Sequence, residues 1–213
     1  SYAKNFLHML GAQKITPLVT RIMDATLVLH GEHTINASTF TAMVTSSTLA
    51  NASQVVASAI GSLSGPLHGG ANEKVVAMLQ KIDSKEDIRP WLEDTLKAKN
   101  VVWGMGHREY SVKDPRANIL TDMVQELFDE RDGGVTDIFE KAIELEKACE
   151  EKLAHKGVYP NVDFYSGILY REMDIPTDIF TPIFAMSRVS GWLAHWIEQI
   201  QDNKIFRPTQ NYV

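Results

Sequence analysis

Two histidines lie in glycine-rich segments that interrupt an otherwise helical pattern. His68 lies within Gly65-Pro66-Leu67-His68-Gly69-Gly70-Ala71-Asn72, just before a helix that is predicted to begin near Gly70 or Ala71. A histidine at a helix N-terminus feels the positive end of the helix dipole and tends to stay neutral. A neutral imidazole can donate a hydrogen bond to a developing enolate. The alternative for this motif alone is a polar turn residue.

His107 lies in the second such segment, Gly104-Met105-Gly106-His107-Arg108. Its glycines allow backbone N–H groups to approach a ligand closely. A tight turn is the structural alternative. A phosphate loop is another, although the Gly-Lys-Ser/Thr ending of a P-loop is missing.

Asp163 is the candidate general base. It ends the segment Pro160-Asn161-Val162-Asp163 and precedes Phe164 and Tyr165. A carboxylate among apolar and aromatic neighbours can have a raised pKa and accept a proton from substrate. The alternative is an N-cap for a helix that runs through Gly167 to Arg171.

Arginines and a histidine pair complete the candidates. Arg116, Arg188 and Arg207 could each clamp a carboxylate bidentately, and several such residues would suit a di-acid. Singly, each could be a surface or packing residue.

His30 and His33 stand at i and i+3 around Glu32. The two histidines could form a metal pair on a helix face. The spacing differs from the His-Glu-x-x-His of zinc hydrolases and no matching third ligand stands out. The sequence therefore predicts no metal site.

Helices must position these side chains, because the apolar pattern has a helical period almost throughout. Three predicted helices begin at a residue pair that ends in proline: Thr16-Pro17, Asp114-Pro115 and Thr181-Pro182. A fourth helix begins after Ser84 in a capping-box pattern. Two more helices span residues 51–63 and residues 136–156, the second of which ends before Gly157. Only Val101-Val102-Trp103 and the C-terminal tail resemble strands. We expect an all-α protein with at most a very short hairpin.

Composition narrows the class of protein. The chain has 213 residues, 44% of them hydrophobic and 23% charged, which are values of a folded globular protein. A net charge of −6 does not suit general nucleic-acid binding, and no apolar run approaches a membrane span. The single cysteine, Cys149, indicates a reducing, cytoplasmic location. The chain starts at Ser1 without a Met or a signal peptide, and we expect that one or both ends were cut from a longer protein.

Taken together, these segments resemble the citrate synthase family. The matching segments follow the family's order: 30–39, 65–72, 104–108, 114–116, 160–167, 188–195 and Arg207-Pro208. The resemblance covers nearly the whole chain but only the C-terminal part of the family, so a substantial N-terminal part of the large domain would be missing. It implies a two-domain helical fold, with residues 1–67 and 175–213 in the large domain and 68–174 in the small domain.

The family resemblance implies a metal-free acyltransferase of the tricarboxylic acid cycle, which condenses oxaloacetate with acetyl-CoA. Asp163 would remove a methyl proton from acetyl-CoA, His68 would stabilise the enolate, and His107 would polarise the oxaloacetate ketone. His33, Arg116 and Arg188 would hold oxaloacetate, and Arg207 would reach the site of a partner subunit in a homodimer. Closure of the two domains over oxaloacetate would exclude water.

By the same resemblance, the CoA adenine would lie along the backbone of Val101, Val102, Gly104, Met105, Gly106 and Arg108. No cofactor is expected to be bound permanently. Similar bacterial members often have a hydrophobic residue at position 109 and a basic residue at 111. This chain has Glu109 and Ser111 there, so Arg108 or Lys113 could contact the CoA phosphates instead.

Three hypotheses stay open from the sequence. The first is citrate synthase, with the propionyl-CoA-dependent 2-methylcitrate synthase as a close variant, because a hydrophobic pocket distinguishes one methyl group by only about 1–3 kcal/mol. The second is a non-catalytic helical scaffold or fragment that retains the fold. The third is a metal hydrolase that uses His30 and His33.

Overall fold

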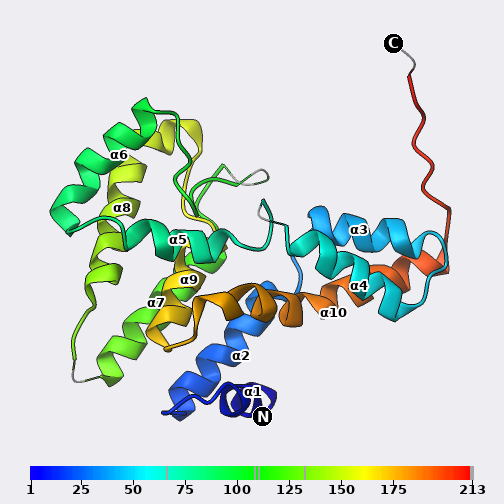
Figure 1. Cartoon of the computed structure of the whole chain (residues 1–213), viewed down its shortest axis with the longest axis horizontal. Helices are drawn as coiled ribbons and strands as arrows, with labels where there is room; N and C mark the ends of the chain where they lie inside the picture. Colours follow the sequence, from blue (N-terminus) through cyan, green and yellow to red (C-terminus); the bar gives the residue numbers. More distant parts are fainter. Residues whose placement is uncertain (66, 108, 110, 132, 212–213) are drawn as a thin grey trace. The chain divides into compact units, whose positions relative to one another are not determined.

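The computed structural model describes residues 1–65, 67–107, 109, 111–131 and 133–211 (Figure 1). Over these residues the protein is built of helices and short connections, which confirms the all-α prediction. The only β-type pairing recorded in this part of the chain is an isolated bridge between Met105 and Pro160. The strand-like interpretation of residues 101–103 and of the tail as far as residue 211 was therefore wrong. Both segments are extended or turning backbone without a partner ladder.

The chain divides into two compact units, which interleave in sequence. Unit 1 comprises residues 1–26 and 70–180, and unit 2 comprises residues 27–69 and 181–213. The division into a large and a small domain that the family resemblance implies concerns the complete protein, and it stays a prediction.

Unit 1 is organised around one buried helix. Its helices are α1 (Tyr2–Met9), most of α2 (Pro17–Gly31), α5 (Ala71–Leu79), α6 (Ile88–Lys97), α7 (Pro115–Glu130), α8 (Asp137–Leu153) and α9 (Val162–Glu172). Helix α9 packs on both α5 and α7, and Phe164, Ile168 and Leu169 are fully buried there. A Cβ at Gly167 would lie 2.4 Å from the Asn72 carbonyl oxygen of α5, so only glycine allows this approach.

Several helix ends follow the local signals of the sequence. Helix α2 begins at Pro17, where the Thr16 hydroxyl accepts the Val19 N–H, and α7 begins at Pro115 with Asp114 as N-cap. After α8, a 3₁₀ turn over Ala154–Lys156 ends at Gly157, whose φ is +67°. The capping box at Ser84 was wrong, because the Ser84 hydroxyl donates to the Asp87 carboxylate instead. Residues Lys85–Asp87 form a 3₁₀ turn, and α6 begins at Ile88.

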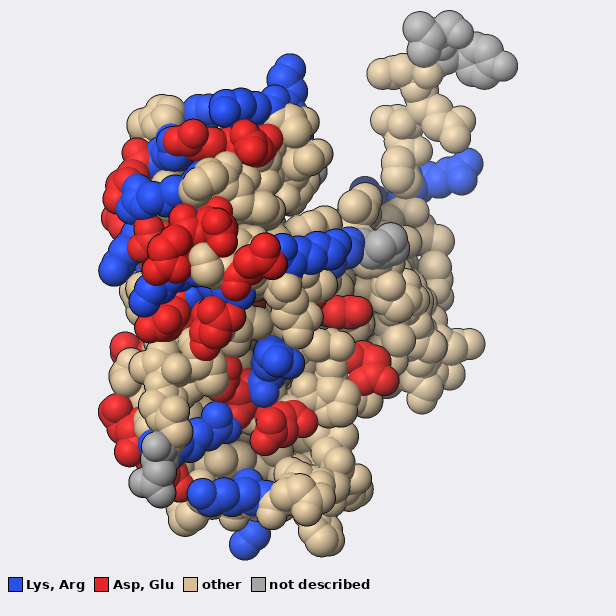
Figure 2. Space-filling model, turned by 60° about the vertical axis from the view of Figure 1, so that its left-hand side comes forward, with Lys and Arg blue, Asp and Glu red and all other residues tan. Residues whose placement is uncertain are grey.

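Helices α6 and α8 of unit 1 are joined by ion pairs across their exposed faces. Arg89 of α6 donates to Glu144 and Glu151 of α8, and Lys152 of α8 pairs with Glu93 of α6. Figure 2 shows basic and acidic side chains mixed over this face. Exposed pairs of this kind each contribute little to stability. No helix in the described part of the chain is long and apolar enough to cross a membrane.

Unit 2 contains α3 (Ala37–Ser46), α4 (Ala52–Leu63) and nearly all of α10 (Phe180–Gln201), together with the last turn of α2. Its core consists of small and large apolar side chains: Ala42, Val55, Ala59, Leu63, Phe184 and Trp192. Helix α4 begins with a capping box, in which Asn51 and Gln54 exchange side-chain and backbone hydrogen bonds. The small residues let α3 and α4 pack closely, and this pair supports the polar residues described next.

Candidate active site

The His68 imidazole is fixed in unit 2 by Ser38 at the start of α3. Its Nε2 atom lies 2.8 Å from the Ser38 hydroxyl oxygen and 3.3 Å from the Ser38 backbone nitrogen. The buried Trp192 indole N–H also donates to that hydroxyl oxygen, at 3.3 Å. Because a backbone N–H can only donate, Nε2 is the accepting nitrogen. This contact favours the neutral tautomer that carries its proton on Nδ1.

The turn that carries His68 is itself constrained. The Gly69 N–H donates to the Leu63 carbonyl at the end of α4, and the Thr181 hydroxyl donates to the Gly69 carbonyl. A Cβ at Gly69 would lie 2.5 Å from the Leu63 carbonyl oxygen. Burial, and secondly the positive charge of Arg188, holds the pKa of His68 below its usual range. The expected neutral histidine ahead of α5 is thus supported by burial as well as by its place before a helix.

Arg188 is a buried cation of unit 2. Its side chain is only 2% exposed, and its Nε donates to the His30 carbonyl at 2.7 Å. The guanidinium carbon lies 4.8 Å from the centre of the Phe184 ring, against which the buried His30 ring also packs edge-on. A guanidinium group can bind a carboxylate bidentately, which makes Arg188 a candidate for binding an anionic ligand. His33 is half-buried in the loop that follows α2.

The metal-pair hypothesis gains no support from these positions. The His30 ring is fully buried against Phe184. In the described part of the chain, no group of three or more His, Cys, Asp or Glu side chains could hold a metal ion.

His107 lies in unit 1, where its Nδ1 accepts the Glu109 backbone N–H at 3.1 Å. Its neutral form therefore carries the proton on Nε2. Burial is the largest cause that holds the pKa of His107 below its usual range; Asp114 and Glu109 oppose the shift, and Arg116 adds to it. A neutral Nε2–H is a suitable donor to a ketone oxygen.

The loop before His107 is pinned to residues 159–161. The Gly106 N–H donates to the Tyr159 carbonyl at 2.8 Å, and the Asn161 N–H donates to the Gly104 carbonyl at 2.9 Å. Gly104 has a φ of +79°, and a Cβ there would lie 2.8 Å from side-chain atoms of Phe164 and Val75. Within the predicted CoA segment Val101 is exposed and Val102 is buried. Arg108, the last residue predicted for that segment, lies outside the described residues.

Asp163 occupies the first turn of α9 and is half-buried. Its N-cap interpretation was wrong, because Asn161 is the N-cap and accepts the Asp163 backbone N–H at 2.9 Å. The same Asn161 side chain donates to the Gly106 carbonyl at 2.9 Å. One amide thus connects the turn that carries Asp163 to the loop that carries His107.

Arg116 forms a bidentate pair with Asp114 of unit 1. Its Nε and Nη2 donate to the two carboxylate oxygens at 3.1 and 2.7 Å, and the Asp114 side chain is 1% exposed. Asp114 also accepts the Arg116 backbone N–H as N-cap of α7. This double contact fixes the orientation of the guanidinium. Lys113, a candidate for the CoA phosphates, pairs with Glu146 of α8.

Arg207 is exposed and lies in the extended segment after α10, which Figure 1 shows in red. The segment stays attached to unit 2 as far as Phe206. The Phe206 N–H donates to the Ser47 hydroxyl, and its ring stacks on Phe40 at 6.1 Å between centroids. Arg207 directly follows this last anchor.

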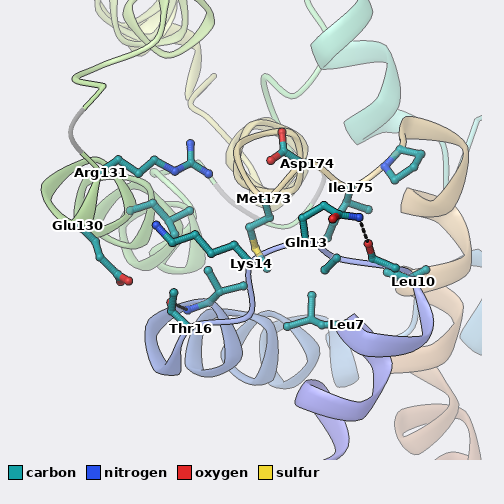
Figure 3. Close-up of a pocket in the computed structure, with 15 residues that line it drawn as sticks. Leu7, Leu10, Gln13, Lys14, Thr16, Glu130, Arg131, Met173, Asp174 and Ile175 are labelled. Carbon is teal, nitrogen blue, oxygen red and sulfur yellow. Dashed lines mark hydrogen bonds between the residues drawn. The ribbon is translucent and has the colours of Figure 1, made fainter.

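Unit 1 also has a cavity of about 290 Å³ between α1, α2, α7 and the end of α9 (Figure 3). Leu7, Leu10 and Met173 contribute apolar surface, and Lys14 and Arg131 contribute charge. None of the predicted site residues lines this cavity. The predicted catalytic and oxaloacetate-binding residues are divided between the two units. Unit 2 contains His33, His68, Arg188 and Arg207, and unit 1 contains His107, Arg116 and Asp163.

The residues that orient these side chains were not identified from the sequence. Ser38 and Trp192 hold His68, Asn161 holds the turn of Asp163, and Asp114 holds Arg116. Asn161 and Asp114 stood in segments that break the helical pattern, so their helix-capping residue types were available as a signal. Nothing in the local sequence connects Trp192 to Ser38, because 154 positions separate them.

Known proteins match nearly the whole of this chain. A family model described as "Citrate synthase, C-terminal domain" matches residues 1–209. The chain is 56% identical to the citrate synthase of Synechocystis sp. and 52% identical to that of Acidithiobacillus ferridurans, over 212 residues each. These matches cover 100% of this chain and 53% and 55% of the two relatives.

Solved structures give the same result. A citrate synthase from Thermoplasma acidophilum, in a ternary complex with carboxymethyl coenzyme A and oxaloacetate, matches with a TM-score of 0.93 and 35% identity. A citrate synthase from Thermotoga maritima matches with a TM-score of 0.89 and 40% identity. Both matches cover 100% of this chain and 57% of the other. The chain thus spans about half the length of its relatives, and it belongs to the citrate synthase family.

Proposed function

We propose that the full-length protein condenses oxaloacetate with acetyl-CoA to give citrate and CoA. The observation that carries the proposal is the hydrogen bonding of His68. Its Nε2 is occupied by Ser38, which leaves the proton on Nδ1 for a thioester oxygen that becomes an enolate oxygen. The relative from Thermoplasma acidophilum binds a CoA analogue and oxaloacetate together, which supports the same substrate pair here.

In the proposed reaction, the Asp163 carboxylate takes a proton from the methyl carbon of acetyl-CoA, and the Nδ1–H of His68 stabilises the enolate that forms. The nucleophilic carbon then attacks the ketone carbon of oxaloacetate. The Nε2–H of His107 donates its proton to the ketone oxygen as this oxygen becomes an alkoxide. Water hydrolyses the resulting thioester and releases CoA.

We further propose that the cationic residues bind the two carboxylates of oxaloacetate. The guanidinium groups of Arg116 and Arg188 are both largely buried and held in fixed directions, by Asp114 and by the His30 carbonyl. Planar, pre-oriented guanidinium groups lose little entropy when they bind a carboxylate bidentately. His33 would donate a further hydrogen bond to the same substrate.

We also propose a homodimer in which Arg207 serves the site of the partner. Its position beyond the last anchor of the tail, and its exposure, support this role. Unit 2 in addition exposes large apolar side chains that a partner could cover: Ile35, Phe40, Val44, Leu49, Ile60, Ile197 and Ile205. Unit 1 exposes fewer such side chains, and exposed apolar surface is typical of an association surface.

The experiment that tests the proposed function is a CoA-release assay on the full-length protein. Oxaloacetate is held saturating while acetyl-CoA or propionyl-CoA is varied. The proposal predicts oxaloacetate-dependent CoA release with a higher kcat/KM for acetyl-CoA. A preference for propionyl-CoA would assign the protein to 2-methylcitrate formation, and no release with either thioester would contradict the proposal.

A further inference from the structure

The loop that carries His33 contains a strained residue. Residues 32–36 join α2 to α3, and Thr34 within them has a φ of +57°. A β-branched side chain rarely adopts this left-handed backbone, so the surrounding structure must hold it there. Its neighbour His33 depends on the same backbone for its direction.

The Glu32 carboxylate makes the contact that holds Thr34. Its Oε2 accepts the Thr34 backbone N–H at 3.0 Å, and its Oε1 lies 2.9 Å from Nε2 of His195 on α10. One carboxylate thus ties the strained residue to a long helix. Partial burial would raise the pKa of Glu32, but the hydrogen bonds from His195 and Thr34, aided by the positive charge of Arg188, lower it below its usual range.

Helix α10 contacts the residues on both sides of Gly31, at the end of α2. Arg188 donates to the His30 carbonyl before it, and His195 contacts Glu32 after it. The helix can come this close only because Gly191 has no side chain: a Cβ there would lie 2.5 Å from the Gly31 carbonyl oxygen and 3.0 Å from Cγ of Glu32. The backbone approach and the imidazole contact therefore act on the same short segment.

We propose that Glu32 and His195 are positioning residues that hold the 32–36 loop in the conformation in which His33 binds oxaloacetate. The inference rests on the proposed function. Glu32 acts through the Thr34 N–H, and His195 acts through Glu32. Neither residue contacts substrate in this proposal, so both affect oxaloacetate binding more than the chemistry of acetyl-CoA.

The test compares Glu32→Ala, His195→Ala and their double variant in the full-length protein, with Glu198→Ala as the matched control. Glu198 is the other carboxylate near His195, but its Oε2 lies 4.0 Å from Nδ1 and it is exposed. Loss of a charge-assisted hydrogen bond predicts about a tenfold rise in the oxaloacetate KM for Glu32→Ala. The acetyl-CoA KM at saturating oxaloacetate should change less than about twofold. The double variant should resemble Glu32→Ala, because His195 acts through that residue.

Rescue distinguishes positioning from general destabilisation. His195→Gln retains a donor toward Glu32 and should keep a lower oxaloacetate KM than His195→Ala. Thr34→Asn, placed in the Glu32→Ala background, should recover part of the lost affinity, because asparagine tolerates a positive φ. A contact that only stabilises the fold would change the melting temperature of these variants and leave their oxaloacetate KM unchanged.

Two results would overturn the inference while the wild-type protein remains active. One is an unchanged oxaloacetate KM in Glu32→Ala. The other is an equal loss in kcat and in both KM values, with a lower melting temperature and no rescue by Thr34→Asn. Absence of CoA release by the wild-type protein would instead contradict the proposed function, and this inference would fall with it.

Discussion

The Ser38 hydroxyl lies 2.8 Å from Nε2 of His68 and accepts the indole N–H of Trp192 on its other side. Ser38 belongs to α3, His68 to the turn before α5, and Trp192 to α10. Three segments far apart in sequence therefore meet at the Ser38 hydroxyl, which also donates to Oδ1 of Asn36 at 2.8 Å. This relationship holds the His68 ring in place, as the proposed role of His68 requires.

Removal of this hydroxyl has a predictable effect. Ser38→Ala leaves Nε2 with only the longer backbone contact at 3.3 Å and leaves the buried Trp192 N–H without its acceptor. We expect kcat to fall about tenfold and the free energy of unfolding to fall by about 1–3 kcal/mol. Steady-state kinetics and urea unfolding check both. The control Ser64→Ala removes an exposed hydroxyl bonded to Gly61, and an equal loss there would refute the specific role of Ser38.

The pH dependence follows from the lowered pKa of His68, of which burial is the largest cause. At a pH between the pKa values of His68 in the folded and the unfolded protein, the unfolded chain binds more protons than the folded chain does. The free energy of unfolding should therefore fall as pH drops below about 6.5 and be unaffected by this group at higher pH. Urea unfolding at pH 5.5 and 7.5 measures how much the free energy of unfolding falls at the lower pH. This fall should be smaller for His68→Gln than for the wild type. The exposed His155, changed to Gln, is the control, and equal losses in all three proteins would contradict the prediction.

Two glycine substitutions test the close packing of α9, the helix that carries Asp163, against α5. In Gly167→Ala the new Cβ would meet the Asn72 carbonyl oxygen at 2.4 Å, so we expect a loss of about 1–3 kcal/mol in stability. Gly61→Ala, in the interior of α4, meets nothing within 4 Å and should gain about 0.5–1 kcal/mol from helix propensity. Thermal or urea unfolding measures both. The packing argument fails if Gly167→Ala is as stable as wild type.

The proposed homodimer, with a site shared between its subunits, can be tested through Arg207. Arg207→Ala should reduce activity without unfolding the subunit, because the residue is exposed in the tail. Inactive Asp163→Asn dimers, when exchanged with Arg207→Ala dimers, should form mixed dimers that regain part of the activity. One of their two sites combines an intact Asp163 with an intact Arg207. Verified subunit exchange without recovery would exclude the contribution of Arg207 to the partner.

Much of the fold was predictable because local chemistry determines helix ends. Thr16-Pro17, Asp114-Pro115 and Gly157 each acted as their residue types indicate. Two local predictions failed, one at a helix start and one for a strand. The Ser84 hydroxyl bonds the Asp87 carboxylate rather than the helix backbone, and β-branched residues 101 and 102 found no strand to pair with in the described chain.

The candidate residues could be chosen from the sequence, whereas their hydrogen bonding could not. His68, His107 and Asp163 stood out because glycine, proline or aromatic residues surround them. Which atom of each imidazole carries the proton depends on Ser38 and on the Glu109 N–H, and these contacts arise only in the folded chain. The pairing of Arg116 with the buried Asp114 was not predicted either, although Asp114 was expected at a helix start and Arg116 was expected to clamp a carboxylate.

The central claim is that Asp163 removes the methyl proton of acetyl-CoA, and Asp163→Asn tests it most directly. An amide cannot accept that proton, whereas the N-cap hydrogen bond to Asn161 uses only the backbone of residue 163 and should survive. The measurement is kcat for CoA release by the full-length variant, with oxaloacetate binding determined by calorimetry on the same sample. We predict a fall in kcat of at least about a hundredfold with oxaloacetate affinity changed less than about threefold. A kcat close to that of the wild type would show that Asp163 is not the base.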